Sequence, residues 1–243
     1  MNDFTEINYK NILQNAITRY SFIAFDDVGE ISNDKEYILW RHDVDFSIHR
    51  SYTLAKIEKK LNVKTTYFLQ LGAEFYNLFE QEIKELVFKI RDFGHDIGLH
   101  FDPTQYRINT KEDLERYLNF EKNILENLFQ VKIKVFSFHN PTEEMFKYDE
   151  LKYSGMINAY AKYFKENFMY CSDSNGYWRH ERLEDFLVKN EIGNRQVLTH
   201  PGWWQKEAMS PFDRIKRCIY GRGEKRIKIY EENLKKFGRK NVK

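Results

Sequence analysis

Short apolar runs rich in β-branched residues alternate along the chain with segments in which apolar residues recur every three or four positions. Such runs are typical of buried strands, and such spaced segments are typical of amphipathic helices. The predicted strands are YILWRHD (37–43), VKTTYFLQ (63–70), HDIGLHFD (95–102), KIKVFSFHN (132–140), FMYCSD (168–173) and RQVLTH (195–200). Their alternation with helices predicts an α/β fold with a largely parallel sheet.

The predicted helices lie between these strands. Ser47 is placed to cap the first helix, the second ends at Gly94, the third begins at Thr110, and a shorter one lies around residues 183–188. Their apolar positions include Leu54, Ile57 and Leu61 in the first, Phe79, Ile83, Leu86, Val87 and Ile90 in the second, and Leu114, Tyr117, Leu118, Ile124 and Leu128 in the third.

No linker rich in Gly, Ser or Pro interrupts residues 37–205. We therefore predict a single domain over residues 1–243. Its core spans about 37–205, residues 1–36 form a helical lead-in, and residues 206–243 form a basic helical segment.

Charge changes this picture only at the C-terminal end. The net charge of the 243-residue chain is +2, but residues 206–243 carry 13 Lys and Arg against 5 Asp and Glu, whereas residues 1–205 carry 26 against 32. A basic segment can contact anionic lipid headgroups, and it can equally be a solvated amphipathic helix that closes the fold. It has no nucleic-acid motif and few aromatic residues for base stacking, so we expect no nucleic-acid partner.

Targeting signals are not evident in the sequence. The first 20 residues are acidic and polar, and no 18 apolar residues run together, which disfavours secretion and membrane spanning. Cys171 and Cys218 are far apart and fit neither a disulfide framework nor a cysteine metal site. We expect a cytoplasmic protein with reduced thiols, in peripheral contact with the inner face of the membrane if the basic segment binds lipid.

Five of the seven histidines lie at the start or end of a predicted strand: His42, His95, His100, His139 and His200. Loops after parallel strands gather over one face of a sheet or barrel, where sites are built. The groups expected to converge there are His42, Asp43, Asp45, His100, Asp102, His139, Asp173 and His200. A single histidine at a strand end is more often structural, and we assign His49, His95 and His180 to that group. An Asp-x-Asp turn can also cap a helix.

Aspartate and histidine without cysteine suit a divalent ion. We expect Zn²⁺ first, with Mn²⁺, Fe²⁺, Co²⁺ or Ni²⁺ as alternatives. A catalytic ion keeps a position for water and lowers its pKa towards neutrality. A carboxylate not bound to the ion can act as base, and a histidine opposite it as acid for the leaving group. These are the requirements of amide or ester hydrolysis.

The motifs resemble, in order over about residues 38–205, those of the NodB-homology polysaccharide deacetylases, which are metal-dependent carbohydrate esterases. WRHDVDFS resembles the family's Asp pair, GHDIGLHFDP its Gly-His-Glu-Ile-Gly-x-His motif, YCSDSNGYW its Asp/Trp motif and VLTHPGWW its Leu-x-His motif. FSFHNP stands where the family has an Arg-x-Pro motif. The resemblance implies a distorted (β/α) barrel.

The resemblance also implies roles for individual residues. His100 would be a metal ligand and His200 the acid. Residues two apart share a face of a strand, so both members of the Asp pair can reach the ion; we assign Asp45 as ligand and Asp43 as base. Asp173 would orient a catalytic histidine by accepting its other ring N–H.

The sequence departs from the family at two places. The second family histidine would lie four residues beyond His100, where this chain has Thr104, and His139 is the predicted replacement ligand, ahead of Asp102. The missing arginine motif weakens the case for a long polymer as substrate. RHDVD is similar to a subgroup linked to bacterial surface-polysaccharide gene clusters, which implies a single N-acylated sugar unit, nucleotide- or lipid-linked.

Substrate contacts are predicted for His42, Asp102, Trp203 and Trp204. The two tryptophans would form an apolar wall, with packing in the core as the alternative; Tyr177 and Trp178 are expected to pack.

Three functions follow from the sequence. The leading one is a metal-dependent hydrolase that removes an acetyl or formyl group from a sugar unit of a surface polysaccharide or its precursor. The second is hydrolysis of a non-sugar amide in the same fold. The third is a non-catalytic binding protein that kept the barrel after losing a ligand at Thr104.

Overall fold

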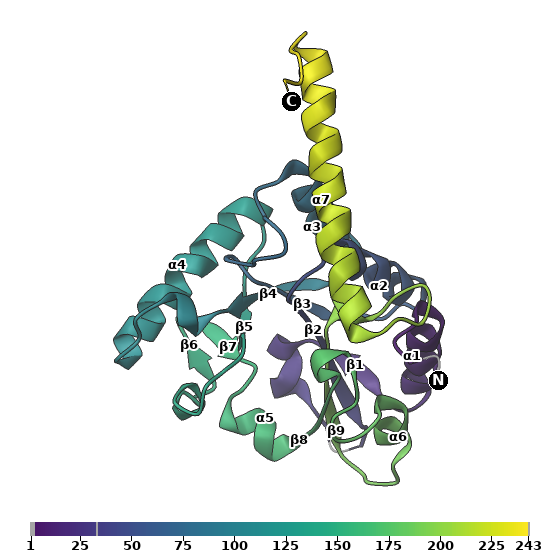
Figure 1. Cartoon of the computed structure of the whole chain (residues 1–243). Coiled ribbons are helices and arrows are strands. Elements are labelled where there is room, and N and C mark those ends of the chain that lie inside the picture. Colours follow the sequence, from purple (N-terminus) through teal and green to yellow (C-terminus); the bar gives the residue numbers. More distant parts are fainter. Residues whose placement is uncertain (1–2, 33, 243) are drawn as a thin grey trace. The chain divides into compact units, whose positions relative to one another are not determined.

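The predicted strands form one sheet in the computed structural model, which describes residues 3–32 and 34–242 (Figure 1). The strands are β1 (Ser21–Ile23), β2 (Tyr37–Val44), β3 (Thr66–Leu69), β4 (Asp96–Phe101), β5 (Val135–Phe138), β6 (Lys152–Tyr153), β7 (Met156–Asn158), β8 (Phe168–Ser172) and β9 (Asn194–Thr199). Their order is β6-β7-β5-β4-β3-β2-β9-β8, with β1 beside the first half of β2. Every pair is parallel except β6 with β7.

All six strands expected from the sequence are present, as β2, β3, β4, β5, β8 and β9. The pattern missed β1, β6 and β7, because strands of two or three residues are too short to show an alternation. β1 lies in the stretch predicted to be a helical lead-in. Residues 1, 2 and 33 of that lead-in, and residue 243 of the basic segment, lie outside the described residues.

Helices connect the strands. They are α1 (Glu6–Arg19), α2 (Ile48–Lys60), α3 (Gln81–Asp92), α4 (Lys111–Phe129), α5 (Lys162–Asn167) and α6 (Leu183–Val188), with short 3-10 turns at Phe25–Glu30, Pro103–Gln105, Met145–Lys147, Ser174–Gly176 and Pro201–Trp203. The predicted caps are confirmed: the Ser47 hydroxyl accepts from the N–H of Arg50 at 3.3 Å, and the Thr110 hydroxyl from that of Asp113 at 3.2 Å. Gly94 follows α3 at φ +97°, a conformation that glycine adopts readily.

Side chains alternate between the two faces of the sheet and bury two apolar clusters. On one face, Tyr67 and Leu69 of β3 belong to a cluster with residues of α2, α3 and α4. On the other face, Phe68 belongs to a cluster that holds both Ile157 of β7 and Phe168 of β8. Strands near opposite ends of the strand order thus meet in one cluster, so the sheet curls around it (Figure 1).

The barrel that this curl begins is not closed. No pairing joins β8 to β6 or β7 within residues 3–32 and 34–242, and the short helix α5 spans the gap between β7 and β8. The expected α/β fold with a distorted barrel is therefore confirmed, and the structure adds that the barrel is incomplete. We call the inner face of the curled sheet the concave face.

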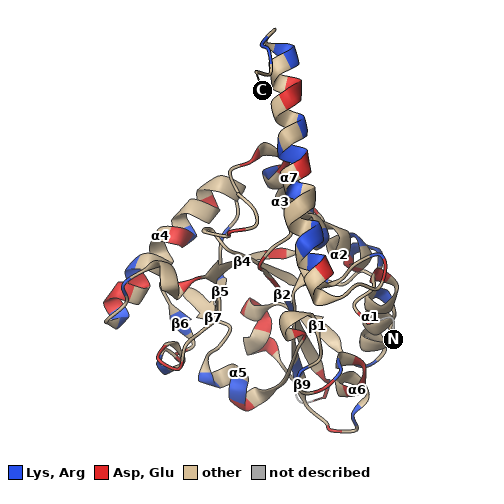
Figure 2. Ribbon diagram, viewed as in Figure 1, with Lys and Arg blue, Asp and Glu red and all other residues tan. Residues whose placement is uncertain are grey.

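The chain divides into two compact units, Met1–Ala208 and Met209–Lys243. The second unit consists mainly of α7 (Pro211–Lys236), which begins at Ser210, whose hydroxyl accepts from the N–H of Asp213 at 3.1 Å. Figure 2 shows Lys and Arg distributed along this helix. Among the described residues no helix is both long enough and apolar enough to cross a membrane. Neither Cys171 nor Cys218 forms a disulfide there.

Candidate active site

The acidic and imidazole side chains singled out in the sequence lie where parallel strands end. Asp45 follows β2, Asp102 follows β4, His139 follows β5, Asp173 follows β8 and His200 follows β9. Because these five strands run parallel in one sheet, their carboxyl ends share an edge.

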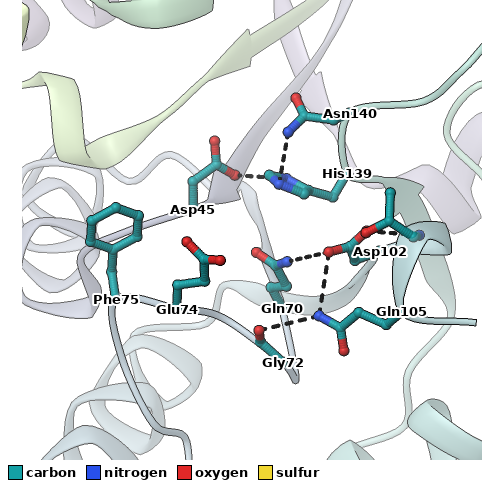
Figure 3. A pocket seen from close by; sticks show the side chains of 10 residues that line it. Asp45, Gln70, Gly72, Glu74, Phe75, Asp102, Gln105, His139 and Asn140 are labelled. Atoms are coloured by element: carbon teal, nitrogen blue, oxygen red, sulfur yellow. Dashed lines mark hydrogen bonds and ion pairs between the residues drawn. The ribbon is translucent and has the colours of Figure 1, made fainter.

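Asp45, His100 and His139 form a compact triad on the concave face. His100 Nε2 lies 3.2 Å from Asp45 Oδ1, His139 Nδ1 lies 3.1 Å from His100 Nε2, and His139 Nδ1 lies 3.5 Å from Asp45 Oδ1. Figure 3 shows the Asp45 carboxylate directed at the His139 ring. A tetrahedral ion with bonds of about 2.0–2.1 Å separates its ligand atoms by roughly 3.3 Å. The three donor atoms therefore fit the ligand spacing of a divalent ion, and His139 stands where the sequence predicted a replacement ligand.

The charges of the triad favour metal binding. Burial raises the pKa of Asp45, but His200, His100 and His139 lower it further, so its carboxylate is ionised. Burial lowers the pKa of His139, yet hydrogen bonding and attraction to Asp45 raise it above its ordinary value. A carboxylate within 3.5 Å of two imidazole nitrogens is a site where a cation can bind in place of a ring proton.

The ring nitrogen of His100 that points away from the triad, Nδ1, is contacted by Ser137 and Asp43. His100 Nδ1 lies 2.8 Å from the Ser137 hydroxyl, which also lies 3.3 Å from Asp43 Oδ1, and Asp43 Oδ2 lies 3.8 Å from the same nitrogen. The carboxylate of Asp43 is 2% exposed and faces the Arg41 guanidinium at 3.6 Å. Such contacts fix the ring orientation of a ligand histidine.

His200 and Asp173 form a pair on the other side of Asp45. His200 Nδ1 lies 2.6 Å from Asp173 Oδ1, and the backbone N–H of His200 donates to both oxygens of Asp173 at 3.0 Å. Trp204 Nε1 donates to Asp173 Oδ2 at 2.9 Å. Burial lowers the pKa of His200, but Asp45 and Asp173 raise it to about 9, which leaves the ring protonated at neutral pH. His200 Nε2 lies 3.8 Å from Asp45 Oδ2, so this proton faces the triad.

An open cleft of about 420 Å³ lies over the triad (Figure 3). Besides Asp45 and His139 it is lined by Gln70, Gly72, Glu74, Phe75, Asp102, Thr104, Gln105 and Asn140. Asp102 Oδ1 accepts from the backbone N–H and the hydroxyl of Thr104 at 3.0 and 2.6 Å, and its Oδ2 accepts from Gln70 and Gln105 at 3.2 and 3.3 Å. Asp102 is thus hydrogen-bonded to its own loop and to Gln70 after β3, and it lies outside the triad.

Three predicted substrate contacts lie elsewhere. His42 has no exposed surface and points to the opposite face of β2, where its Nε2 meets Glu58 at 2.7 Å and its Nδ1 meets the Thr199 hydroxyl at 2.7 Å. Trp204 is also fully buried and holds Asp173, while Trp203 is 8% exposed and packs against Phe46 at 4.6 Å between ring centroids. The structure therefore does not support substrate contact by His42 or Trp204, and it favours the packing alternative for Trp203.

Glu58 explains the position of His42. This buried carboxylate also accepts hydrogen bonds from the hydroxyls of Tyr9, Thr65 and Tyr67. Burial raises the pKa of Glu58, but His42 and the surrounding donors lower it to about 2. A charged group without contact with water is stable only with this number of donors, so the cluster is part of the core between β2 and α2.

The remaining histidines have structural or surface positions. His95 is buried and its Nε2 lies 3.3 Å from the carbonyl oxygen of Ala55. His49 is on the surface beside Glu82 at 3.0 Å, and His180 is exposed. Their assignment to the structural group from sequence agrees with these positions.

Sequence reasoning missed three residues around the site: Arg41, Ser137 and Gln70. Side chains two apart point to the same face of a strand, so Arg41 shares the face of Asp43, and Ser137 that of His139. Applied to every position, the same rule places His42 on the other face. Gln70 carried no comparable signal, because it follows a strand of entirely buried residues.

Comparison with known proteins gives remote structural likenesses. No family model matches the sequence, and no curated protein matches it. A mutant of BA3943, a CE4 family pseudoenzyme from Bacillus anthracis, with restored enzymatic activity, superposes with a TM-score of 0.48 at 16% identity, covering 80% of this chain. This chain spans 65% of the length of that protein.

Two further solved structures are similar. Peptidoglycan deacetylase PdaC from Bacillus subtilis has a TM-score of 0.48 at 13% identity, covering 85% of this chain and 99% of that chain. A family 4 carbohydrate esterase from Bacillus anthracis has a TM-score of 0.45 at 15% identity, covering 89% and 86%.

Proposed function

We propose that this protein is a metal-dependent hydrolase of the NodB-homology deacetylase type that removes an N-acyl group, acetyl or formyl, from a sugar unit. The observation that carries the proposal is the triad of Asp45, His100 and His139 facing the protonated His200 across a few ångströms, beside an open cleft. A metal-ligand set next to a proton donor is suited to metal-dependent amide hydrolysis.

Asp45, His100 and His139 would hold a divalent ion, which would supply Lewis acidity and lower the pKa of a bound water. The residues of the chain provide the rest. Asp173, held by Trp204 and the backbone, keeps His200 in one orientation with its Nε2 toward the triad. His200 donates its proton to the departing amine. The sequence assigned Asp43 as the base, but its contacts favour a different role. Asp43 and Ser137 together orient the ring of His100.

The cleft supports a single sugar unit as substrate. At about 420 Å³ it lies low in the range of ligand sites, roughly 300–1,000 Å³. Its amide and carboxylate groups, from Gln70, Asp102, Gln105 and Asn140, can hydrogen-bond sugar hydroxyls, and Phe75 offers a ring face. We infer a unit of a surface polysaccharide or its precursor, linked to a nucleotide or a lipid.

The experiment is an activity assay of the metal-loaded full-length protein on N-acetyl and N-formyl sugar nucleotides, with loss of the acyl group followed by mass spectrometry. The control is Asp45→Asn, which removes the ligand charge at nearly constant size. Deacylation by the wild type and none by the variant is the expected result. No loss of acyl groups from any of the sugars would contradict the sugar part of the proposal.

Two other functions have specific observations in their favour. A non-sugar amide would use the same triad and proton donor, and the same assay on cyclic and linear amides tests it. A non-catalytic protein is favoured by Thr104, which bonds Asp102 instead of completing the family's ligand set. Dialysis against Zn²⁺ or Mn²⁺ followed by elemental analysis tests this alternative. Retention of less than about one ion per ten protein molecules would mean that the protein is not a metal-dependent hydrolase.

The helix α7 supports a proposed contact with the inner face of the membrane. Apolar residues on it are exposed at Phe212, Ile219, Ile227 and Tyr230, and Lys and Arg outnumber acids along it (Figure 2). We expect the full chain to float with vesicles containing anionic lipid and not with neutral ones, and Ile219→Asp to weaken the binding. Equal flotation with both vesicle types would contradict an electrostatic contact.

A further inference from the structure

A second cavity, of about 450 Å³, opens at the gap between β7 and β8. We call it the seam cavity. It is lined by Arg41, Phe146, Ala159, Tyr160, Phe164, Lys165, Phe168, Tyr170 and Gln196, and it shares none of these with the cleft over the triad. Five of the nine are aromatic, so its walls are largely apolar. The proposed hydrolysis does not use this cavity.

Arg41 is the unusual member of this lining. Its side chain has no exposed surface, and none of its three guanidinium nitrogens has a hydrogen-bond partner among residues 3–32 and 34–242. The nearest carboxylate, Asp43 Oδ2, lies 3.6 Å from Nη2, and the ring of Tyr160 lies 4.8 Å from the guanidinium carbon. A buried cation without hydrogen bonds is costly, and Arg41 lies in the wall of the seam cavity.

Arg195, a second buried arginine, differs from Arg41 in its hydrogen bonds. It is also fully buried, but its Nη1 donates to the carbonyl of Gly193 at 2.8 Å and its Nη2 to that of Glu191 at 2.6 Å. Two backbone carbonyls thus accept from its Nη groups, and only its Nε has no hydrogen-bond partner among the described residues. Arg41 has no such carbonyls: its ion pair with Asp43 and its contact with the Tyr160 ring leave all three nitrogens without a hydrogen bond among the described residues.

The charged residues around the seam cavity indicate which ligand charge it would favour. Arg41 and Lys165 are the charged residues in the lining, and no acidic residue lines it. Asp43 partly balances Arg41, which leaves about one uncompensated positive charge for the cavity. One excess positive charge matches a monoanion better than a dianion, and the flat fork of arginine matches a carboxylate.

We propose that the seam cavity is a binding site for a small organic monocarboxylate, with its carboxylate on Arg41 and its apolar body against the rings of Phe146, Phe168 and Tyr170. This site is separate from the proposed hydrolase site and stands whether or not the chain is a hydrolase. The probe is 3-phenylpropanoate, which carries one carboxylate on a short aromatic body.

The test is calorimetric titration of the full-length protein with this probe. The uncharged 3-phenylpropan-1-ol and the dianion phenyl phosphate are the comparison ligands. We expect saturable binding of the carboxylate and binding at least about tenfold weaker for both comparison ligands. Arg41→Met keeps the apolar stem and is expected to weaken the carboxylate roughly 10- to 100-fold.

Arg41→Met leaves Asp43 without its cation, so a second variant keeps the test independent of folding. Phe146 is 41% exposed and lines the cavity, and Phe146→Ala is expected to weaken binding about 3- to 10-fold. Phe79→Ala, at a ring that is 60% exposed and outside the cavity, is the matched control and should leave binding unchanged.

Each contrary result overturns the proposal. These are the absence of saturable binding up to about 10 mM carboxylate, an alcohol that binds as tightly, a phosphate that binds more tightly, and equal binding by the wild type and Phe146→Ala. Titrations before and after loading with Zn²⁺ should agree. Affinity that arises only with Zn²⁺ would assign the carboxylate to the metal centre and not to the seam cavity.

Discussion

Removing the imidazole of His139 is the most direct test of the proposed metal centre. In the family pattern the second histidine ligand would be at position 104, and His139 comes from a different strand. His139→Ala removes one of three donor atoms and leaves Asp45 and His100 3.2 Å apart. We expect this variant to fold and to lose tight metal binding.

The magnitude follows from the contacts of the side chain. Loss of a partner that only orients a ligand typically lowers metal affinity roughly 10- to 100-fold, so loss of a direct ligand should lower it more than about 100-fold, or about 2.7 kcal/mol or more. Without metal the cost is small, because the His139 side chain is 20% exposed and, among the described residues, its one side-chain hydrogen-bond partner outside the triad is Asn140 at 2.9 Å. The unfolding free energy of the metal-free protein should change by less than about 1 kcal/mol.

The assay is competition for Zn²⁺ against a chromophoric chelator, with thermal unfolding measured with and without the ion. The wild type should gain stability with Zn²⁺, and His139→Ala should not. His180→Ala is the matched control, because His180 is exposed and lies outside the triad. An affinity for Zn²⁺ in His139→Ala within threefold of the wild type would show that this histidine is no ligand and would refute the reasoning from the three donor distances.

Three further predictions concern other groups. Asp43→Asn should lower metal affinity about 10- to 100-fold if Asp43 orients His100, whereas a base acting only in catalysis would leave affinity unchanged and lower kcat. His200→Gln should lower kcat by about 10²- to 10⁴-fold while metal affinity stays near that of the wild type, as measured by the same competition. Burial raises the pKa of Glu121 to about 7 although the Tyr106 hydroxyl donates to it, so the folded state keeps this proton to a higher pH than the unfolded chain. Stability should therefore fall by about 3 kcal/mol as the pH rises from about 4.5 to about 7, and Glu121→Gln should remove that loss in urea denaturation.

The controls for these predictions use the same kinds of substitution. Glu143→Gln changes an exposed carboxyl and should leave the pH profile of stability as in the wild type. If stability still falls as the pH rises in Glu121→Gln, the pH dependence comes from another group. For His200, an unchanged kcat in the Gln variant would exclude this residue as the proton donor.

The order of strands and helices was determined by the sequence alone. Apolar periodicity is a local property, and it placed six of the strands within a few residues of their ends. The spacing of Asp43 and Asp45 also placed both on one face of β2, because side chains two apart point the same way. The caps at Ser47 and Thr110 follow from the same local chemistry.

Only the tertiary structure decided which strand-end groups meet. The Asp45–His100–His139 triad depends on the order of strands in the sheet and on the curl that turns their ends inward, and both are set by packing between residues far apart in the chain. Alternation along β2 puts His42 on the opposite face, but its contact there with buried Glu58 has no trace in local spacing.

The same distinction holds for the seam cavity. The sequence shows an arginine two residues before an aspartate, but only the open edge between β7 and β8 places that arginine in the wall of a ring-lined cavity. Local patterns fix the conformation of short segments because their causes lie within a few residues. A site assembled from several strands is fixed by long-range packing, which those patterns do not contain.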